Sequence, residues 1–223
     1  MAKFFNQICF LSIKKEMNRF LKASIGTIQE MKELQTITDF FFELSVLKKL
    51  PRSGSFIAGI SRPDTVGEHV FRAAEIAFVL AEIHKADGEH AAFLTLIHDN
   101  GETRIGDHNR LMNRYFNAGD AEKRAFYDQI RNFPKHIERK FRNAFDEFKA
   151  QKTIESKCAR DADLLELAFQ SKEFLEQGFS GKKNWLDNIN GHFHTKIAQE
   201  IFDEMQKKSS TDWWQGLKHV PKT

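Results

Sequence analysis

Apolar residues recur at steps of three and four along most of this chain, and that period is typical of α-helices with one buried face. The first clear case predicts a helix over residues 31–50, which Pro51 would end. Its expected apolar face consists of Leu34, Ile37, Phe40, Phe41, Leu44 and Leu47. A Gly- and Ser-rich loop over 52–63 follows this helix.

The same periodicity predicts further helices with recognisable ends. Asp64 or Thr65 would cap one of them, and Thr153 another that ends at Gly178. Pro134 is expected to break a charged amphipathic stretch into two parts. The predicted segments are 64–84, 89–103, 119–150, 154–177 and 191–208. Alternating strand patterns are almost absent, so we expect an all-α domain, built as a single helical bundle.

The chain has 223 residues, enough for one domain with a substantial core. We divide it into an N-terminal extension over 1–30, a domain over 31–210 and a C-terminal tail over 211–223. The 34 basic and 31 acidic residues leave a net charge of +3, too small an excess to favour a nucleic-acid partner.

Cysteine content and apolar runs bear on the cellular location of the protein. Cys9 and Cys158 are its only cysteines, which excludes a disulfide framework and favours a reducing cytoplasm. No apolar run approaches the roughly 20 residues needed to cross a bilayer, so no membrane is expected. The first 13 residues faintly resemble a signal peptide, but Asn6, Gln7 and Ser12 interrupt the apolar run.

Four side chains suggest a metal site. His98 and Asp99 follow a strongly apolar run, where a buried pair is costly unless it is paired or bound to a metal. His69 lies on the first turns of its predicted helix. Asp163 lies on an apolar helix face, whereas Asp161 is expected to point outward. Two imidazoles and two carboxylates suit one divalent transition metal with positions open for water and a phosphate oxygen.

Two acidic residues lie close to this set. Glu102 is four residues from His98 and three from Asp99, so all three can face one region. It is well placed to support a ligand or act as a base. Asp107 lies just past the helix end and can turn back toward the same centre. The alternative is that these residues are ordinary buried polar pairs of a helical bundle. Five other histidines, at 84, 90, 192, 194 and 219, are expected to be hydrogen-bonded structural residues.

Four motifs in order resemble the HD-domain metal-dependent phosphohydrolase superfamily, and within it the small 5′-deoxynucleotidase branch. The match covers roughly residues 35–178. The matching segments are Leu47-Lys-Lys-Leu-Pro-Arg52, Arg62-Pro-Asp-Thr-Val-Gly-Glu-His69, Leu96-Ile-His-Asp-Asn-Gly-Glu-Thr-Arg-Ile-Gly-Asp107, and Phe145-Asp-Glu-Phe148 followed by Thr153-Ile-Glu-Ser-Lys-Cys-Ala-Arg-Asp-Ala-Asp163.

The resemblance implies a role for each site residue. His69, His98, Asp99 and Asp163 would hold one divalent cation. The N/O ligand set itself suits Mn, Co, Fe, Ni or Zn. Glu102 is the implied acid/base, and Asp107 is implied near the sugar. Arg52 would meet the phosphate, with Arg62 as a helper. The resemblance also implies a homodimer.

This sequence departs from the branch in the loop after Arg52. The branch often has a tryptophan over 52–58, where only Phe56 is aromatic here. The stretch 56–60 is apolar and offers no side chain that could hydrogen-bond a nucleotide. The expected activity is hydrolysis of (deoxy)nucleoside 5′-monophosphates to a nucleoside and phosphate. Two alternatives stay open: a different phosphate ester, such as a nucleoside triphosphate or sugar phosphate, and a non-catalytic metal-binding regulatory module.

Overall fold

The protein is described by a computed structural model that covers residues 15–17, 26, 30–215 and 217. The expectation of a separate extension over 1–30 therefore falls almost wholly outside the described residues. Within them the chain is helical without a strand, and one isolated antiparallel bridge joins Pro51 to Thr65. The all-α prediction is confirmed. None of the described helices is long and apolar enough to cross a membrane.

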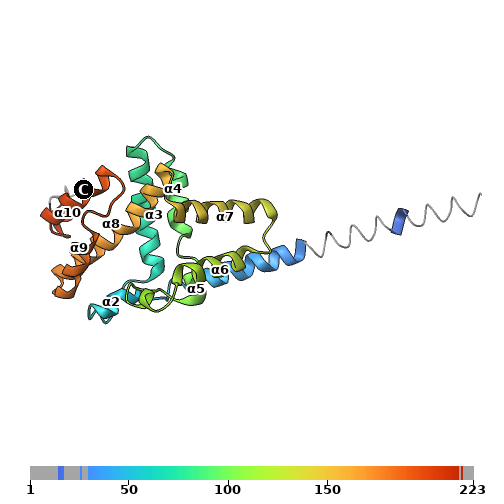
Figure 1. Cartoon of the computed structure of the whole chain (residues 1–223), viewed down its shortest axis with the longest axis horizontal. Helices are drawn as coiled ribbons and strands as arrows, with labels where there is room; N and C mark the ends of the chain where they lie inside the picture. Colours follow the sequence, from blue (N-terminus) through green and yellow to red (C-terminus); the bar gives the residue numbers. More distant parts are fainter. Residues whose placement is uncertain (1–14, 18–25, 27–29, 216, 218–223) are drawn as a thin grey trace, which may run out of the picture.

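Three helices form the centre of the bundle and carry the candidate site. They are α3 (Val66–Ile83), α4 (Gly88–Ile97) and α8 (Ile154–Glu176), and each packs on the other two (Figure 1). Ala73, Ala77 and Ala81 of α3 are completely buried, as their small size predicted, because a methyl side chain lets helix backbones approach closely. Thr65 caps α3, and Thr153 caps α8.

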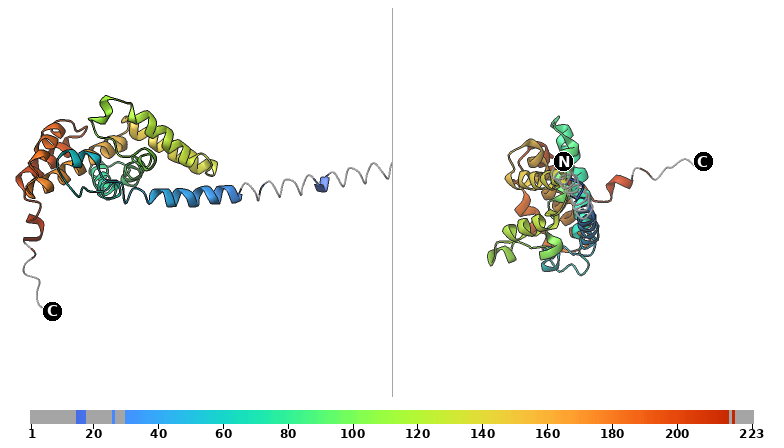
Figure 2. Two further views of the ribbon diagram at one scale, coloured as in Figure 1. Left: turned by 90° about the horizontal axis from the view of Figure 1, so that it is seen from below. Right: turned by 90° about the vertical axis from the view of Figure 1, so that its right-hand side faces the viewer.

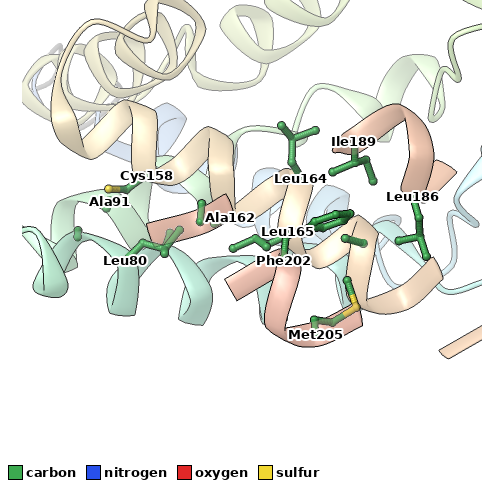
Figure 3. Packing of buried hydrophobic residues seen from close by; sticks show 14 residues of the cluster. Leu80, Ala91, Cys158, Ala162, Leu164, Leu165, Leu186, Ile189, Phe202 and Met205 are labelled. Atoms are coloured by element: carbon green, nitrogen blue, oxygen red, sulfur yellow. The ribbon is translucent and has the colours of Figure 1, made fainter. Parts of the chain in front are cut away.

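Two cores flank this centre. In one, side chains of α3, α4 and α8 pack against α9 (Lys183–Ile189) and α10 (Lys196–Lys207), and Figure 3 shows Leu164 and Leu165 of α8 among them. In the other, α4 and α8 meet α6 (Ala118–Ile130), α7 (Lys135–Ala150) and the helix over 30–44. Figure 2 shows this last helix running alongside the α6–α7 pair. The remaining elements are α2 (Ser53–Ile57), α5 (Glu102–Ile105), α11 (Asp212–Gln215) and the 3₁₀ turns η1 (Met112–Arg114) and η2 (Ser180–Lys182).

The first predicted helix differs from the structure in length and in its buried face. It ends at residue 44, and short turn hydrogen bonds such as Ser45 N to Phe42 O follow it. Ile37, Phe40, Leu44 and Leu47 pack into the cores as predicted, but Leu34 and Phe41 are 66% and 65% exposed, so the apolar face was predicted too wide. Phe40 packs edge-on against Phe133, which fixes the rotation of this helix.

Several other boundaries also need correction. The predicted helix over 89–103 is two helices, α4 and α5, separated by a turn over 98–101. The last predicted helix starts at residue 196 instead of 191, because Thr195 is its N-cap. The expected loop over 52–63 contains α2, and α9 was not predicted. Pro134 does separate α6 from α7, as the sequence indicates.

Candidate metal centre and its cavity

Two buried histidines reach the same point from different elements. His69 lies on the first turn of α3, whose start is fixed because Thr65 and Glu68 form a reciprocal capping box. His98 directly follows α4. Their side chains are completely and almost completely buried, and their ring centroids are 5.6 Å apart.

Hydrogen bonds fix which nitrogen each histidine presents. His69 Nδ1 donates to Glu166 Oε2, and Glu166 Oε1 accepts two bonds from the Arg72 guanidinium at 2.8 and 3.0 Å. His98 Nδ1 donates to the Thr95 carbonyl at 2.5 Å. Since each Nδ1 carries the proton, both Nε2 atoms are left with a lone pair, the arrangement of a metal-ligating imidazole.

Two carboxylates complete a cluster of four donors. Asp99 Oδ1 lies 3.1 Å from His98 Nε2, and Asp99 Oδ2 lies 3.8 Å from His69 Nε2. Asp163 Oδ1 lies 3.2 Å from His69 Nε2 and 3.9 Å from His98 Nε2. One donor atom from each of His69, His98 and Asp99 falls within 4.8 Å of the other two.

This cluster fits a divalent cation. His69 Nε2 is buried yet makes no hydrogen bond, although Asp163 Oδ1 is close to it. Burial and the charge of Arg52 lower the pKa of His69, but the nearby carboxylates of Asp163 and Glu166 outweigh both and raise it to about 9. Histidines and Arg52 hold the pKa of Asp99 well below its usual range against the opposing effect of burial. The centre is thus built to hold positive charge, and its N and O donors are those of a transition-metal site.

Glu102 begins α5, immediately after the turn that carries Asp99. Its Oε2 is buried and has no hydrogen-bond partner. Burial and the neighbouring carboxylates of Asp99 and Asp107 raise the pKa of Glu102 to about 11. A carboxyl that keeps its proton beside a cation-binding centre is suited to proton transfer, because a nearby cation would lower its pKa again.

Arg52 lies beside these carboxylates as the N-cap residue of α2. Its Nη1 is 3.3 Å from Asp99 Oδ2 and 3.8 Å from Asp107 Oδ1. Burial alone would lower the pKa of Arg52, but Asp99 and Asp107 raise it, so the guanidinium stays charged. Asp107 Oδ2 also accepts a 2.5 Å bond from the Ser53 backbone N–H, which ties the start of α2 to the site.

A cavity of about 610 Å³ opens beside the cluster, a volume that suits a small organic ligand. Arg52, Asp99, Glu102, Asp107 and Asp163 all line it. The structure does not bring the other two predicted substrate residues there. Arg62 is exposed and Phe56 is 51% exposed, and neither belongs to the cavity wall.

The prediction for Asp161 is wrong. Its side chain is completely buried, and its carboxylate accepts hydrogen bonds from the backbone N–H groups of His194 and Thr195 at 2.7 and 2.8 Å. The apolar pattern of α8 could not show this, because the partners come from the start of α10. A buried carboxylate is tolerated there because orphan backbone donors at a helix start satisfy it.

Sequence reasoning also missed several residues around the centre. Glu166 lies three residues after Asp163, and Arg160, whose Nη1 pairs with Asp163 Oδ2, lies three before it. That helical spacing could have indicated both residues. Lys182 and Trp185, which line the cavity, carry no comparable signal because they come from η2 and α9.

The comparison with protein families decides the relationship. The family model described as the HD domain matches residues 44–206, most of the chain. The chain belongs to the HD domain family. This membership agrees with the centre, since the histidine and the aspartate at 98 and 99 are adjacent in sequence and both contribute to it.

Several known proteins are similar to this HD domain. The 5′-deoxynucleotidase HDDC2 of Homo sapiens is 23% identical over 181 residues, which span 80% of this chain and 88% of that protein. The 5′-deoxynucleotidase hdd1 of Schizosaccharomyces pombe is 26% identical over 155 residues, 67% and 77% of the two chains. A conserved hypothetical protein from Pyrococcus furiosus superposes with a TM-score of 0.66 at 28% identity, covering 77% and 99%. A predicted metal-dependent phosphohydrolase from Magnetospirillum magnetotacticum shares the fold, with a TM-score of 0.59 at 21% identity over 79% and 92%.

Proposed function

We propose that this HD domain is a metal-dependent phosphohydrolase that converts (deoxy)nucleoside 5′-monophosphates to a nucleoside and inorganic phosphate. The observation that carries the proposal is the donor cluster at the wall of a ligand-sized cavity, next to a protonatable Glu102 and a charged Arg52. The curated relatives named 5′-deoxynucleotidase support the choice of substrate class.

His69, His98, Asp99 and Asp163 would hold one divalent transition metal, as the Nε2 atoms and carboxylate oxygens allow. Mn, Co, Fe, Ni and Zn all accept such a donor set, and affinity alone does not select among them. When bound, the metal would supply Lewis-acid polarisation of a phosphoryl oxygen and a water of lowered pKa.

The protein's own groups account for the remaining steps. Glu102 accepts the proton of the attacking water and can return it to the leaving nucleoside oxygen. Arg52 faces the phosphoryl oxygens, where negative charge develops. Asp107 lies near the sugar and holds the Ser53 backbone, which keeps Arg52 in place. In this proposal Arg62 and Phe56 have no contact with substrate.

Phosphate release from a substrate panel tests the proposal. The panel contains deoxy- and ribonucleoside 5′-monophosphates, a nucleoside triphosphate and a sugar phosphate, assayed after metal is stripped and restored. We expect metal-dependent release from the monophosphates. Glu102→Gln should keep its metal but lose about 10²- to 10⁴-fold in kcat, the usual contribution of a general acid/base. Glu200→Gln, at an exposed carboxylate of α10, is the matched control.

The other outcomes separate the alternatives. Release only from the triphosphate or the sugar phosphate would assign a different ester to the same site. Stoichiometric metal binding without release from any ester would indicate a non-catalytic metal-binding module.

The proposal includes a homodimer, which the exposed apolar side chains of α3 support. It also includes a cytoplasmic location, for which the composition argument from two cysteines is the support; Cys158 is a free thiol.

A further inference from the structure

One aromatic side chain on the cavity wall has no role in the chemistry described above. Trp185 of α9 is the only Trp, Tyr or Phe among the described residues that line the cavity. Its side chain is half-buried, so part of the indole is accessible from the cavity. Nucleobases bind favourably to an aromatic plane because stacking removes both surfaces from water and requires no particular hydrogen-bond pattern.

The indole lies close to the segment that presents the phosphate-binding arginine. A Cβ built on Gly54 would be 3.5 Å from Trp185 Cζ2 and 3.7 Å from its Nε1. Gly54 is only two residues beyond Arg52, which limits the backbone separation to about 7 Å. The cavity therefore has a cationic group at Arg52 and an aromatic wall at Trp185, which lies beside Gly54. A nucleoside 5′-phosphate has the same sequence of groups, with phosphate at one end and a flat base at the other.

Lys182 contacts the indole of Trp185 and holds it in place. It is 1% exposed, its Nζ lies 4.9 Å from the Trp185 ring centroid, and it donates to Ser55 Oγ at 3.0 Å. A second ring, Phe174, lies 5.4 Å from the same ammonium. Within the described part of the chain Lys182 forms no ion pair, and burial lowers the pKa of its ammonium. A desolvated ammonium is drawn to an aromatic face, so this contact restrains the indole.

Two other rings near the site are less suited to stack on a nucleobase. Phe56 is not among the residues that line the cavity, and it is 51% exposed. His108 lines the cavity, but its ring already packs edge-on against Phe116 at 5.0 Å.

We propose that Trp185 is the nucleobase-stacking residue of this site and that Lys182 is the positioning residue that holds its indole. This proposal rests on the proposed function, because it names the part of the protein that recognises the nucleoside. It predicts that the enzyme distinguishes a nucleotide from a base-free sugar phosphate through α9, an element outside the metal centre.

Kinetics on two substrates test the stacking role. Trp185→Ala should lower kcat/KM for a deoxynucleoside 5′-monophosphate by roughly 5- to 150-fold, the range reported by alanine substitution for base–aromatic stacking. Its kcat/KM for 2-deoxyribose 5-phosphate, which lacks the base, should stay within about twofold. Trp185→Phe should retain most of the nucleotide activity. Trp213→Ala, at a 75% exposed tryptophan of α11, is the control. An equal loss on both substrates would overturn the proposal.

Lys182 is tested by the division of its effect between KM and kcat. Lys182→Met should raise KM for the nucleotide with little change in kcat, because the indole is less restrained while the metal centre is untouched. Lys182→Arg keeps a cation under the ring and should restore KM. A loss confined to kcat would contradict the positioning role.

A direct binding measurement separates this proposal from the proposed function. In a Trp213→Phe/Trp214→Phe background, Trp185 is the only tryptophan left of the three in the chain. Stacking of dTMP should quench its fluorescence, whereas 2-deoxyribose 5-phosphate should not. Quenching by dTMP without hydrolysis would uphold the stacking site and reject the activity. Hydrolysis of dTMP without quenching would uphold the activity and reject the stacking site. The fluorescence measurement also tests the stacking role if the Trp185→Ala variant fails to fold.

Discussion

Glu166 fixes the orientation of His69, one of the four proposed metal ligands. Its Oε2 accepts the His69 Nδ1 proton, and its Oε1 is held by Arg72, so the imidazole has one orientation and one tautomer. We expect Glu166→Gln to weaken metal affinity by about 10- to 100-fold, the usual cost of losing such a partner. At saturating metal, kcat should change little, because no substrate contact is lost. Titration of the stripped protein with Zn²⁺ or Mn²⁺ measures the affinity.

Glu173→Gln is the matched control for this variant. Glu173 binds the same arginine, with Oε1 2.7 Å from Arg72 Nη1, but does not touch the histidine. Its removal should leave metal affinity within about threefold of the wild type. If both variants weaken the metal equally, Arg72 rather than the Nδ1 contact orients the site.

At the residue scale, the sequence predicted the four residues of the donor cluster but not the residues that hydrogen-bond to them and orient them. His69, His98, Asp99 and Asp163 could be picked out because helical spacing and apolar neighbours marked them. The role of Glu166 depends on how α3 and α8 are rotated against each other, which one-dimensional periodicity does not contain. Asp161 was misplaced for the same reason, since its partners belong to α10.

At the scale of elements, the short turn over 98–101 between α4 and α5 is where the structure differs most from the predicted helix. The apolar pattern runs unbroken into it, so the sequence predicted one helix over 89–103. In the structure this helix is interrupted there, and Gly101 lies against α6, where a Cβ would be 2.5 Å from the Glu122 carbonyl oxygen. This close approach is a tertiary contact, which the one-dimensional apolar pattern does not contain.

Gly101→Ala should therefore destabilise the protein. The added Cβ meets a backbone oxygen that cannot move without shifting α6, and such overpacking costs about 1–3 kcal/mol. For a chain of this size that corresponds to a fall in Tm of very roughly 2–12 °C. Gly119→Ala is the control, because it lies in α6 with its nearest neighbour, Asn117 Oδ1, at 3.6 Å. That change should be neutral or slightly stabilising, since alanine favours helix.

Thermal unfolding followed by circular dichroism measures both variants. An unchanged Tm for Gly101→Ala would mean that the turn is not packed as closely as described. The elements that sequence reasoning missed outright, α2 and α9, are five and seven residues long, and such lengths carry too few turns for an apolar period to be recognised.

For the whole molecule, fold class and helix order could be predicted, because long helices dominate and each one shows the helical spacing of apolar residues in the sequence. The sequence did not predict which apolar side chains remain exposed to solvent. The helix over 30–44 was expected to bury Leu34 and Phe41, yet both are exposed. On α3, Phe71 and Phe78 are 66% and 42% exposed. Both pairs are seven residues apart, so each forms a stripe along one helix.

These stripes lead to the last prediction, that two copies of the chain associate. Large apolar side chains that are exposed in a row destabilise a monomer in water, and a second copy of the chain would cover them. We expect light scattering behind size exclusion to give twice the 25.9 kDa mass of the chain. Phe71→Glu/Phe78→Glu should shift the protein to monomer, because burying charges at an apolar interface is unfavourable. Trp213→Glu, at another exposed aromatic, should leave the mass unchanged. A wild type that is monomeric at all concentrations would reject the dimer and leave the stripes to a different partner.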